Sequence, residues 1–375
     1  MAKDSILKEH YAQISSYFNT LEDPRRTIKG NIHYPLIEIL FLTISAAVSG
    51  ANDWVAVEVF GEAKLDWLRG FYPYKNGTPS HDTLGRFFNK LCPQAFEECF
   101  REWIKSLPFD YKDTVVAIDG KTARGSYSDN KKALHIVSAY ATENGLCLGQ
   151  IKTEEKSNEI TAIPRLLNLI EVKGAIVTID AMGCQKDIAE EIIGKKADYL
   201  LQVKGNQKNL ATQITERFNL NVNIKSWTDT DCGHGLIETR LCQVIYDLDF
   251  MTNKADWKEV KSVARIYSER ICKKTGERST YSRYYISSLQ ADPVKIGKAT
   301  RSHWAIENNL HWNLDVIFQE DKSLKKKGYS AENYNIIAKA ALTLIDQEKS
   351  NKKSKNSKRQ LAALDDKYRA KILGV

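Results

Sequence analysis

Between residues 113 and about 210, short apolar segments alternate with segments of helical spacing, and this order restricts the possible folds more than any other feature. Strands are predicted for "TVVAIDG", "GAIVTIDAMG" and "DYLLQVKG", and a hairpin for "ALHIVSAYATENGLCLGQIKTEE". Helices are predicted for "NEITAIPRLLNLIE" and "CQKDIAEEIIGKKA". The order strand, hairpin, helix, strand, helix, strand indicates a mixed sheet with helices on its faces.

The segments on either side of this region differ from it in pattern. Residues 1–112 place large apolar side chains at helical spacing and predict a mostly helical N-terminal domain. Residues 113–345 predict an α/β domain that is interrupted by a β-rich insertion at about 221–290. Residues 346–375 predict a basic, flexible tail that binds DNA phosphates, because "KSNKKSKNSKR" is a low-complexity run of cations without an apolar face.

Charge and cysteine content narrow the class of protein. The chain has 375 residues and a formal charge of +8, which permits a polyanionic partner such as nucleic acid. Its seven cysteines include no CxxC motif, so we expect free thiols in a reducing compartment. The N-terminus lacks the apolar segment of a signal peptide, and no apolar run is long enough for a comfortable membrane span. We therefore expect a cytoplasmic protein without membrane contact.

Three carboxylates carry the main chemical signal. Asp119 and Asp180 each end an apolar strand, and Glu307 lies on a predicted helix much later in the chain. Acids at the ends of buried strands lie at the edge of a sheet, where a ligand can reach them. Carboxylate oxygens are hard ligands that suit Mg²⁺ or Mn²⁺. Two such ions can activate an attacking oxygen and stabilise a leaving oxygen in phosphoryl transfer.

Each acid also has an interpretation without chemistry. The pair Asp119-Gly120 would suit a hairpin turn after a strand. Asp180 could cap the helix that is predicted to begin near Cys184. A single glutamate on a helix, such as Glu307, most often belongs to a solvated face. The combination is more specific than any one acid, because the order of elements places all three in one architecture.

Eight stretches together resemble the DDE transposases of bacterial insertion sequences. They are similar, more narrowly, to the ISAs group, which includes the H-repeat-associated proteins. The stretches are "LEDPR", "GTPSHDTLGRFF", "AIDGKTARGS", "VTIDAMGCQ", "YLLQVKGNQ", "HGLIETR", "YYISSL" and "HWAIENNLHWNLDVIFQED". The resemblance covers nearly the whole chain in the expected order, from about residue 17 to 345.

The resemblance implies a ribonuclease-H-like catalytic domain whose first two acids come from the first and fourth strands. The third acid lies on a helix after an insertion, and by motif position the three are Asp119, Asp180 and Glu307. The implied cofactor is Mg²⁺, with Mn²⁺ as a second suitable ion. The implied activity is cleavage at transposon DNA ends, followed by attack of the freed 3′-OH on target DNA. The implied partners are DNA and further copies of the chain on paired DNA ends, with the N-terminal domain in end recognition or assembly.

The surroundings of the acids supply candidates for DNA contact. These candidates are Lys121, Arg124, Lys204, Asn206, Gln207, His303, Trp304 and Trp312. The two cations after Asp119 could meet phosphates, offset the clustered negative charge, or belong to a solvated turn. The two tryptophans fit either core packing or stacking on an unpaired base.

The third acid's surroundings depart from the wider family pattern. Related insertion-sequence transposases often have an arginine four residues before this acid and a lysine seven residues after it. Those positions hold His303 and Leu314 here. His303 could still contact a phosphate when it is protonated, but the arginine's role does not transfer to it directly.

Three competing functions are compatible with these residues. His303, Glu307 and His311 lie on roughly one helical face and could form a metal triad of a metallohydrolase, although two helical turns make one shared ion awkward. The chain could also be an inactive DNA-binding relic, or a metal-dependent DNA nuclease that does not join strands. The presence of all three acids argues against an inactive relic, whereas the same carboxylates would also serve a nuclease that does not join strands.

Overall fold

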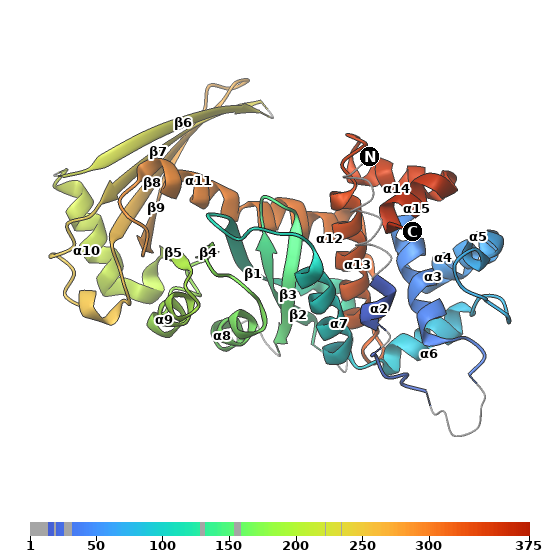
Figure 1. Cartoon of the computed structure of the whole chain (residues 1–375). Helices are drawn as coiled ribbons and strands as arrows, with labels where there is room; N and C mark the ends of the chain where they lie inside the picture. Colours follow the sequence, from blue (N-terminus) through green and yellow to red (C-terminus); the bar gives the residue numbers. More distant parts are fainter. Residues whose placement is uncertain are drawn as a thin grey trace.

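The computed structural model describes residues 14–18, 20–25, 32–127, 132–153, 159–221, 223–233 and 235–375. Its centre is one nine-stranded sheet in the order β3-β2-β1-β4-β5-β9-β8-β7-β6. Most N-terminal helices gather at one end of the molecule, and strands β6 to β9 form the other end (Figure 1). The first five strands, β1 to β5, lie between these two ends.

The first five strands confirm the predicted mixed sheet. They are β1 (Val115–Ala123), β2 (Leu134–Ala141), β3 (Leu146–Thr153), β4 (Ile176–Ile179) and β5 (Asp198–Val203). Strands β2 and β3 form the predicted hairpin, and β1 pairs with β2 in antiparallel fashion. Strand β4 lies parallel to both β1 and β5. This is the ribonuclease-H-like arrangement; residues 154–158, where the predicted hairpin and the next helix meet, lie outside the described part of the chain.

The β-rich insertion extends the same sheet. Its strands are β6 (Lys225–Gly233), β7 (Leu236–Ile245), β8 (Ser262–Cys272) and β9 (Arg278–Ser287). Strand β9 pairs antiparallel with β5, so the four insertion strands continue the sheet beyond the first five strands. Helix α10 (Lys208–Asn219) leads into them. The insertion therefore lies on the same side of the core as β5, next to the segment that carries Glu307.

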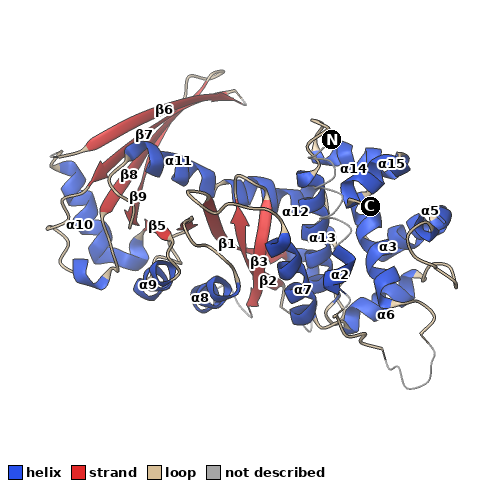
Figure 2. Ribbon diagram, in the orientation of Figure 1, coloured by secondary structure: helices blue, strands red, loops and turns tan. Residues whose placement is uncertain are grey.

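Helices cover both faces of the sheet, as predicted. Helices α8 (Glu159–Leu169) and α9 (Lys186–Gly194) lie on one face, and α11 (Pro293–His303) crosses the other (Figure 2). Ile296 of α11 packs in one apolar cluster with Val115 and Ile176. Side chains alternate between the faces of a strand, so Asp119 and Thr178 lie on the same face as Val115 and Ile176. The acids therefore face the helix that leads to Glu307.

The region before β1 contains helices and no strand among its described residues, which agrees with the predicted helical N-terminal region. These helices are α2 (Ile14–Phe18), α3 (Leu36–Val48), α4 (Trp54–Ala63), α5 (Leu65–Arg69), α6 (His81–Lys90) and α7 (Pro93–Ser106). Helix α13 (Ser330–Gln347) packs against α3, α6 and α7 as well as strand β3. One apolar core is therefore continuous from the N-terminal helices to the sheet.

The prediction of a flexible C-terminal tail is wrong. Residues 355–373 form two helices, α14 (Lys355–Leu364) and α15 (Asp366–Leu373). Arg359 is 2% exposed and Arg369 is fully buried. Both guanidinium groups donate to backbone carbonyls, and Arg369 also stacks 3.9 Å from the ring of Trp67. Arg359 and Arg369 therefore stabilise the fold, although the lysine-rich sequence around them is typical of a solvated segment. The sequence does not reveal this role, because several of their carbonyl and aromatic partners come from distant parts of the chain.

None of the helices in the described residues combines the length and the apolar composition that crossing a lipid bilayer requires.

Candidate active site

Asp119 lies inside strand β1 rather than at its end. The parallel pairing of β1 with β4 stops at Ile118 and Ile179, but the antiparallel pairing with β2 continues and sets Asp119 opposite Ser138. The prediction that the strand ends at this acid is therefore wrong, and so is the alternative of a hairpin turn. Strand β1 therefore has a neighbouring strand on both edges up to Ile118 and on one edge from Asp119 onward. The edge without a partner strand leaves room beside the carboxylate.

Asp180 follows strand β4 directly. Because Ile118 and Ile179 are register partners, the two aspartates occupy equivalent positions on neighbouring parallel strands. One Asp180 oxygen accepts a hydrogen bond from the backbone N–H of Met182, at 2.9 Å. Helix α9 begins at Lys186, so Asp180 is not its N-cap. The hydrogen bond fixes the carboxylate at the start of the loop after β4.

Asn206 and Gln207 hold that same loop. The side-chain amide of Asn206 donates to the carbonyl of Ala181 at 2.6 Å, and Gln207 donates to the carbonyl of Cys184 at 2.9 Å. Both bonds join the end of β5 to the loop that begins at Asp180. Lys204 is exposed beside them. The motif "VKGNQ" thus supplies two side-chain amides, Asn206 and Gln207, that hold the loop and one exposed cation, Lys204, beside it.

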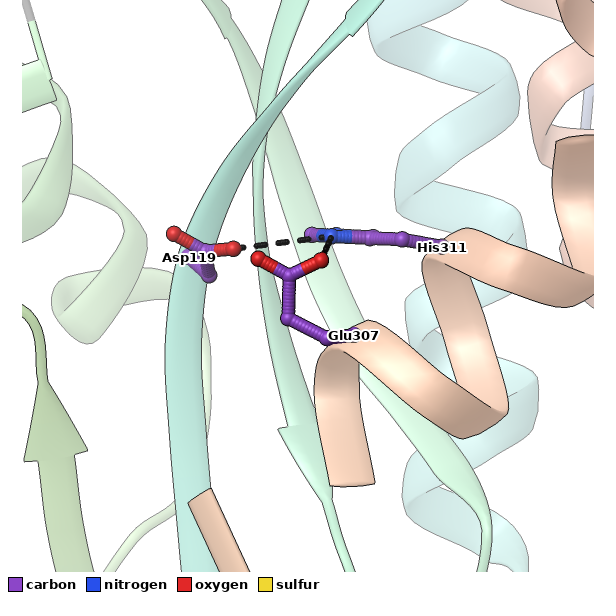
Figure 3. Close-up of side chains that lie close together, drawn as sticks. All are labelled: Asp119, Glu307 and His311. Atoms are coloured by element: carbon purple, nitrogen blue, oxygen red, sulfur yellow. Dashed lines mark ion pairs between the residues drawn. The ribbon is translucent and has the colours of Figure 1, made fainter. Parts of the chain in front are cut away.

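Glu307 lies in a π-helical turn, η5 (Ile306–His311), which continues from α11 into α12 (Trp312–Val316). Figure 3 shows Glu307 and His311 extending from this segment toward Asp119 on β1. His311 Nδ1 lies 3.5 Å from Asp119 Oδ2 and 3.8 Å from Glu307 Oε2. One donor atom from each of the three side chains lies within 4.8 Å of the others. The site therefore brings Asp119 together with two residues that follow it in sequence by 188 and 192 positions.

The two acids of this cluster differ in burial and in pKa. Burial, together with the negative charges of Glu307 and Asp180, raises the pKa of Asp119 to about 8. The Glu307 side chain is 50% exposed, and the adjacent His311 lowers its pKa below the ordinary value. The directions are opposite because burial is the largest influence on the pKa of Asp119, whereas His311 is the largest influence on the pKa of Glu307. The cluster thus holds negative charge that a cation would stabilise.

His303 faces strand β4 rather than the acid cluster. Its Nδ1 forms a hydrogen bond with the hydroxyl of Thr178 at 2.9 Å. Burial lowers its pKa to about 4, so the ring is neutral at neutral pH. Among the described residues, the donors within reach of one ion are Asp119, Glu307 and His311, so the all-helical triad with His303 is not formed. Leu314, at the position of the family's lysine, is buried in the core.

Lys121 is engaged in a half-buried ion-pair network. Its ammonium lies 2.7 Å from Asp315 Oδ1 and 2.6 Å from Glu320 Oε2. Burial alone would lower the pKa of Lys121, but these two carboxylates outweigh burial and raise it. Arg124 is exposed, and its backbone N–H donates to Asp321. Of the roles considered for Lys121, this geometry favours compensation of negative charge.

Trp304 and Trp312 are 43% and 54% exposed, so neither belongs to the core. The guanidinium of Arg283 lies 4.9 Å from the ring of Trp304. Trp304 also lines a cavity of about 580 Å³ between strands β7–β9 and the α11–η5 segment. The same cavity is lined by cationic and aromatic side chains that include Arg240, Arg270, Arg283, Arg301 and Tyr281. Arginines thus line a cavity beside an exposed aromatic ring that lies three residues before Glu307.

Two buried polar groups beside the site were not predicted. Lys339 of α13 is 2% exposed and donates to Ser138 at 2.8 Å, opposite Asp119 on the neighbouring strand. Its sequence signal is a single lysine in the apolar run "NIIAKAALTLI". On the other face, His135 and Glu159 lie 2.6 Å apart behind Gly120. A Cβ at Gly120 would lie 2.3 Å from Glu159, which explains the glycine after the acid.

Comparisons with known proteins agree with this architecture. The model "DDE_Tnp_1-associated" matches residues 15–104, and the model "Transposase DDE domain" matches residues 110–344. "Putative transposase YncI" of Escherichia coli O157:H7 is 42% identical over 366 residues, which cover 95% of this chain and 93% of that protein. "H repeat-associated putative transposase YhhI" of E. coli strain K12 is 40% identical over 372 residues, with coverages of 96% and 97%.

Among solved structures, a piggyBac transposase chain from a synaptic complex with hairpin DNA aligns with a TM-score of 0.46 and 11% sequence identity. The alignment covers 97% of this chain and 80% of that chain. A score of this size carries no conclusion beyond the likeness itself.

Proposed function

Because the chain belongs to the family of DDE transposases, we propose that it cuts DNA at transposon ends and joins the freed 3′ ends to target DNA. We further propose that several copies of the chain assemble on paired DNA ends in the bacterial cytoplasm. The alternatives are a nuclease without joining activity and an inactive DNA-binding relic. The observation that supports the proposal is that Glu307 lies beside Asp119, while Asp180 occupies the equivalent position on the neighbouring parallel strand.

The donor set fits a divalent cation. Asp119 is a buried carboxylate whose charge is disfavoured by its surroundings, and Glu307 and His311 present further donor atoms beside it. Asp180, at the equivalent position of the next strand, would complete a second set with Asp119. A bound Mg²⁺ or Mn²⁺ would lower the pKa of an attacking water and stabilise the leaving oxygen.

The chain's own residues would orient the reaction. The Met182 N–H holds the Asp180 carboxylate, and Asn206 holds the loop behind it, so the acid does not have to be ordered when DNA binds. The nucleophiles are a water molecule in the first step and the freed 3′-OH in the second, so no covalent protein–DNA intermediate is needed. Arg124 and Lys204 are exposed near this edge and would meet phosphates.

The cleavage and joining assay tests the proposal directly. End-labelled donor DNA and a target plasmid should yield cut ends and joined products with Mg²⁺ or Mn²⁺. Ca²⁺ should support DNA binding with little chemistry, because its variable coordination orients the reacting oxygens poorly. Cutting without joining would indicate the nuclease, and binding without cutting would indicate the relic. Undiminished cleavage in excess chelator would overturn the metal-dependent mechanism.

Replacement of Trp304 tests the exposed aromatic surface beside the acids. We propose that this ring stacks on an unpaired nucleotide near the cut, with Arg283 beside the ring meeting a phosphate. Trp304→Ala should weaken the binding of end DNA that carries unpaired nucleotides at the cut by roughly 1–3 kcal/mol. Fully paired DNA should be affected less, and Trp304→Phe should retain most of the affinity. Equal losses on both DNAs in a filter-binding titration would argue against stacking.

A further inference from the structure

His311 is the least expected member of the acid cluster. It is 5% exposed, and its Nδ1 faces oxygens of both Asp119 and Glu307. Its other ring nitrogen, Nε2, is buried and has no hydrogen-bond partner among the described residues. A buried nitrogen without a partner destabilises the fold. Hydrogen bonding by Nε2 therefore does not explain the position of the ring, and the Nδ1 edge that faces the acids is the feature that remains.

The two separations that involve His311 fall in the range for ligands of a single ion. With metal–ligand distances of about 2.1 Å, neighbouring ligands of an octahedral ion lie about 3 Å apart and opposite ligands about 4.2 Å apart. The distances from His311 Nδ1, 3.5 Å to Asp119 Oδ2 and 3.8 Å to Glu307 Oε2, lie between these limits. Coordination through Nδ1 would leave the ring proton on Nε2, and no donor among the described residues points at that nitrogen to oppose this tautomer.

We propose that His311 is a direct ligand, through Nδ1, of the metal ion that Asp119 and Glu307 bind. An imidazole nitrogen is a poorer ligand for Mg²⁺, which prefers oxygen, than for transition-metal ions. The nitrogen therefore shifts the preference of this site toward Mn²⁺ relative to an all-carboxylate site. The inference rests on the proposed function only in that this cluster binds a divalent metal.

Pulsed electron paramagnetic resonance of the Mn²⁺-loaded, DNA-free protein tests this ligand. The spin-echo modulation should contain ¹⁴N frequencies from a directly coordinated imidazole, and these should disappear in His311→Gln. The matched control is His303→Gln, which removes a nearby imidazole whose Nδ1 is bonded to Thr178. The nitrogen signal should persist in that control. Its absence from the wild type, or its persistence in His311→Gln, would overturn the proposal.

Two further measurements keep the test decisive if His311→Gln folds poorly. Labelling the wild type with ¹⁵N-histidine should change the modulation frequencies, and unchanged frequencies would contradict nitrogen coordination. The Kd for Mn²⁺, measured by calorimetry, should rise by at least about tenfold in His311→Gln, because loss of even an outer partner of a metal site often costs that much. The Kd for Mg²⁺ should rise less. These readouts do not depend on cleavage, so an inactive enzyme with an intact nitrogen signal would refute only the proposed function.

Discussion

Asp119→Asn is expected to abolish cleavage and joining while making the metal-free protein more stable. The carboxylate is a proposed metal ligand, so its loss should slow cleavage by roughly 10³-fold or more. In the metal-free protein, the same carboxylate is buried near Asp180 and Glu307, which disfavours its charge. Neutralising it should therefore raise the free energy of unfolding by roughly 0.5–2 kcal/mol, as is common when a strained functional site is relaxed.

The pH dependence of stability separates this effect from ordinary packing. The folded-state pKa of Asp119 is raised to about 8, so the folded protein binds more protons than the unfolded chain between about pH 4 and pH 8. The contribution of Asp119 to stability is therefore present at low pH and is lost as the pH rises through this window. The asparagine variant should lack this loss, and its gain over the wild type should be largest above pH 8.

Thermal melts in chelator at pH 5 and pH 8.5, together with the cleavage assay, measure both effects. The matched control is Asp113→Asn, two residues before β1, where the carboxylate is exposed and pairs with Lys295 at 2.6 Å. Asparagine tolerates the positive φ of 60° at that position. This control should cut DNA normally and should gain no stability. An Asp119→Asn protein that melts earlier than the wild type and still cuts DNA would remove Asp119 from the proposed metal site.

The sequence was sufficient to predict the order of the core elements and to single out Asp119, which lies within β1, and Asp180, which follows β4. Period-two and helical spacing are local properties, so the hairpin after β1 and the helices after β3 and β4 could be predicted from short windows. Asp119 and Glu307 were expected to meet because of the family resemblance, and the structure brings them together. The convergence itself depends on the crossing of α11 over the sheet, which no local pattern encodes.

Features that depend on distant partners were not predictable from local patterns. Strand β1 continues past Asp119 because β2 supplies hydrogen bonds there, although the following residues look like a turn. The π-helical turn at Glu307 has no signature in "AIENNLHW", yet it helps to set which side chains face the acids. Helical spacing predicted His311 beside Glu307 only as part of a metallohydrolase triad with His303, whereas in the structure the third member of the cluster is Asp119. Lys339 could not, because its partners Ser138 and Gln150 lie about 190 to 200 residues away.

Arg359→Ala is expected to cause a large loss of stability, because this C-terminal side chain joins three parts of the chain. Its Nε and Nη2 donate to the carbonyl of Ala47 at 2.9 and 2.8 Å, near the end of α3. Its Nη1 donates to the carbonyl of Ile317 at 2.6 Å, just after α12, and Nη2 donates to Asn52. The guanidinium also lies 4.2 Å from the ring of Phe318. Truncation would leave several buried acceptors unsatisfied, at a cost of roughly 3–5 kcal/mol.

The controls for Arg359→Ala distinguish a structural cation from a phosphate-binding one. Arg359→Lys should recover little of the stability, because an ammonium cannot reproduce the planar fork that contacts Ala47 and Ile317 together. Lys353→Ala, six residues earlier and exposed, should leave the melting temperature unchanged. If the C-terminal segment instead served mainly to hold DNA, Arg359→Ala would melt like the wild type, and both variants would weaken DNA binding with a smaller salt dependence. Thermal melts without DNA, followed by binding titrations at two salt concentrations, separate these outcomes. If Arg359 is structural, its replacement lowers the melting temperature already in the absence of DNA, because α14 is then held less firmly against the rest of the chain.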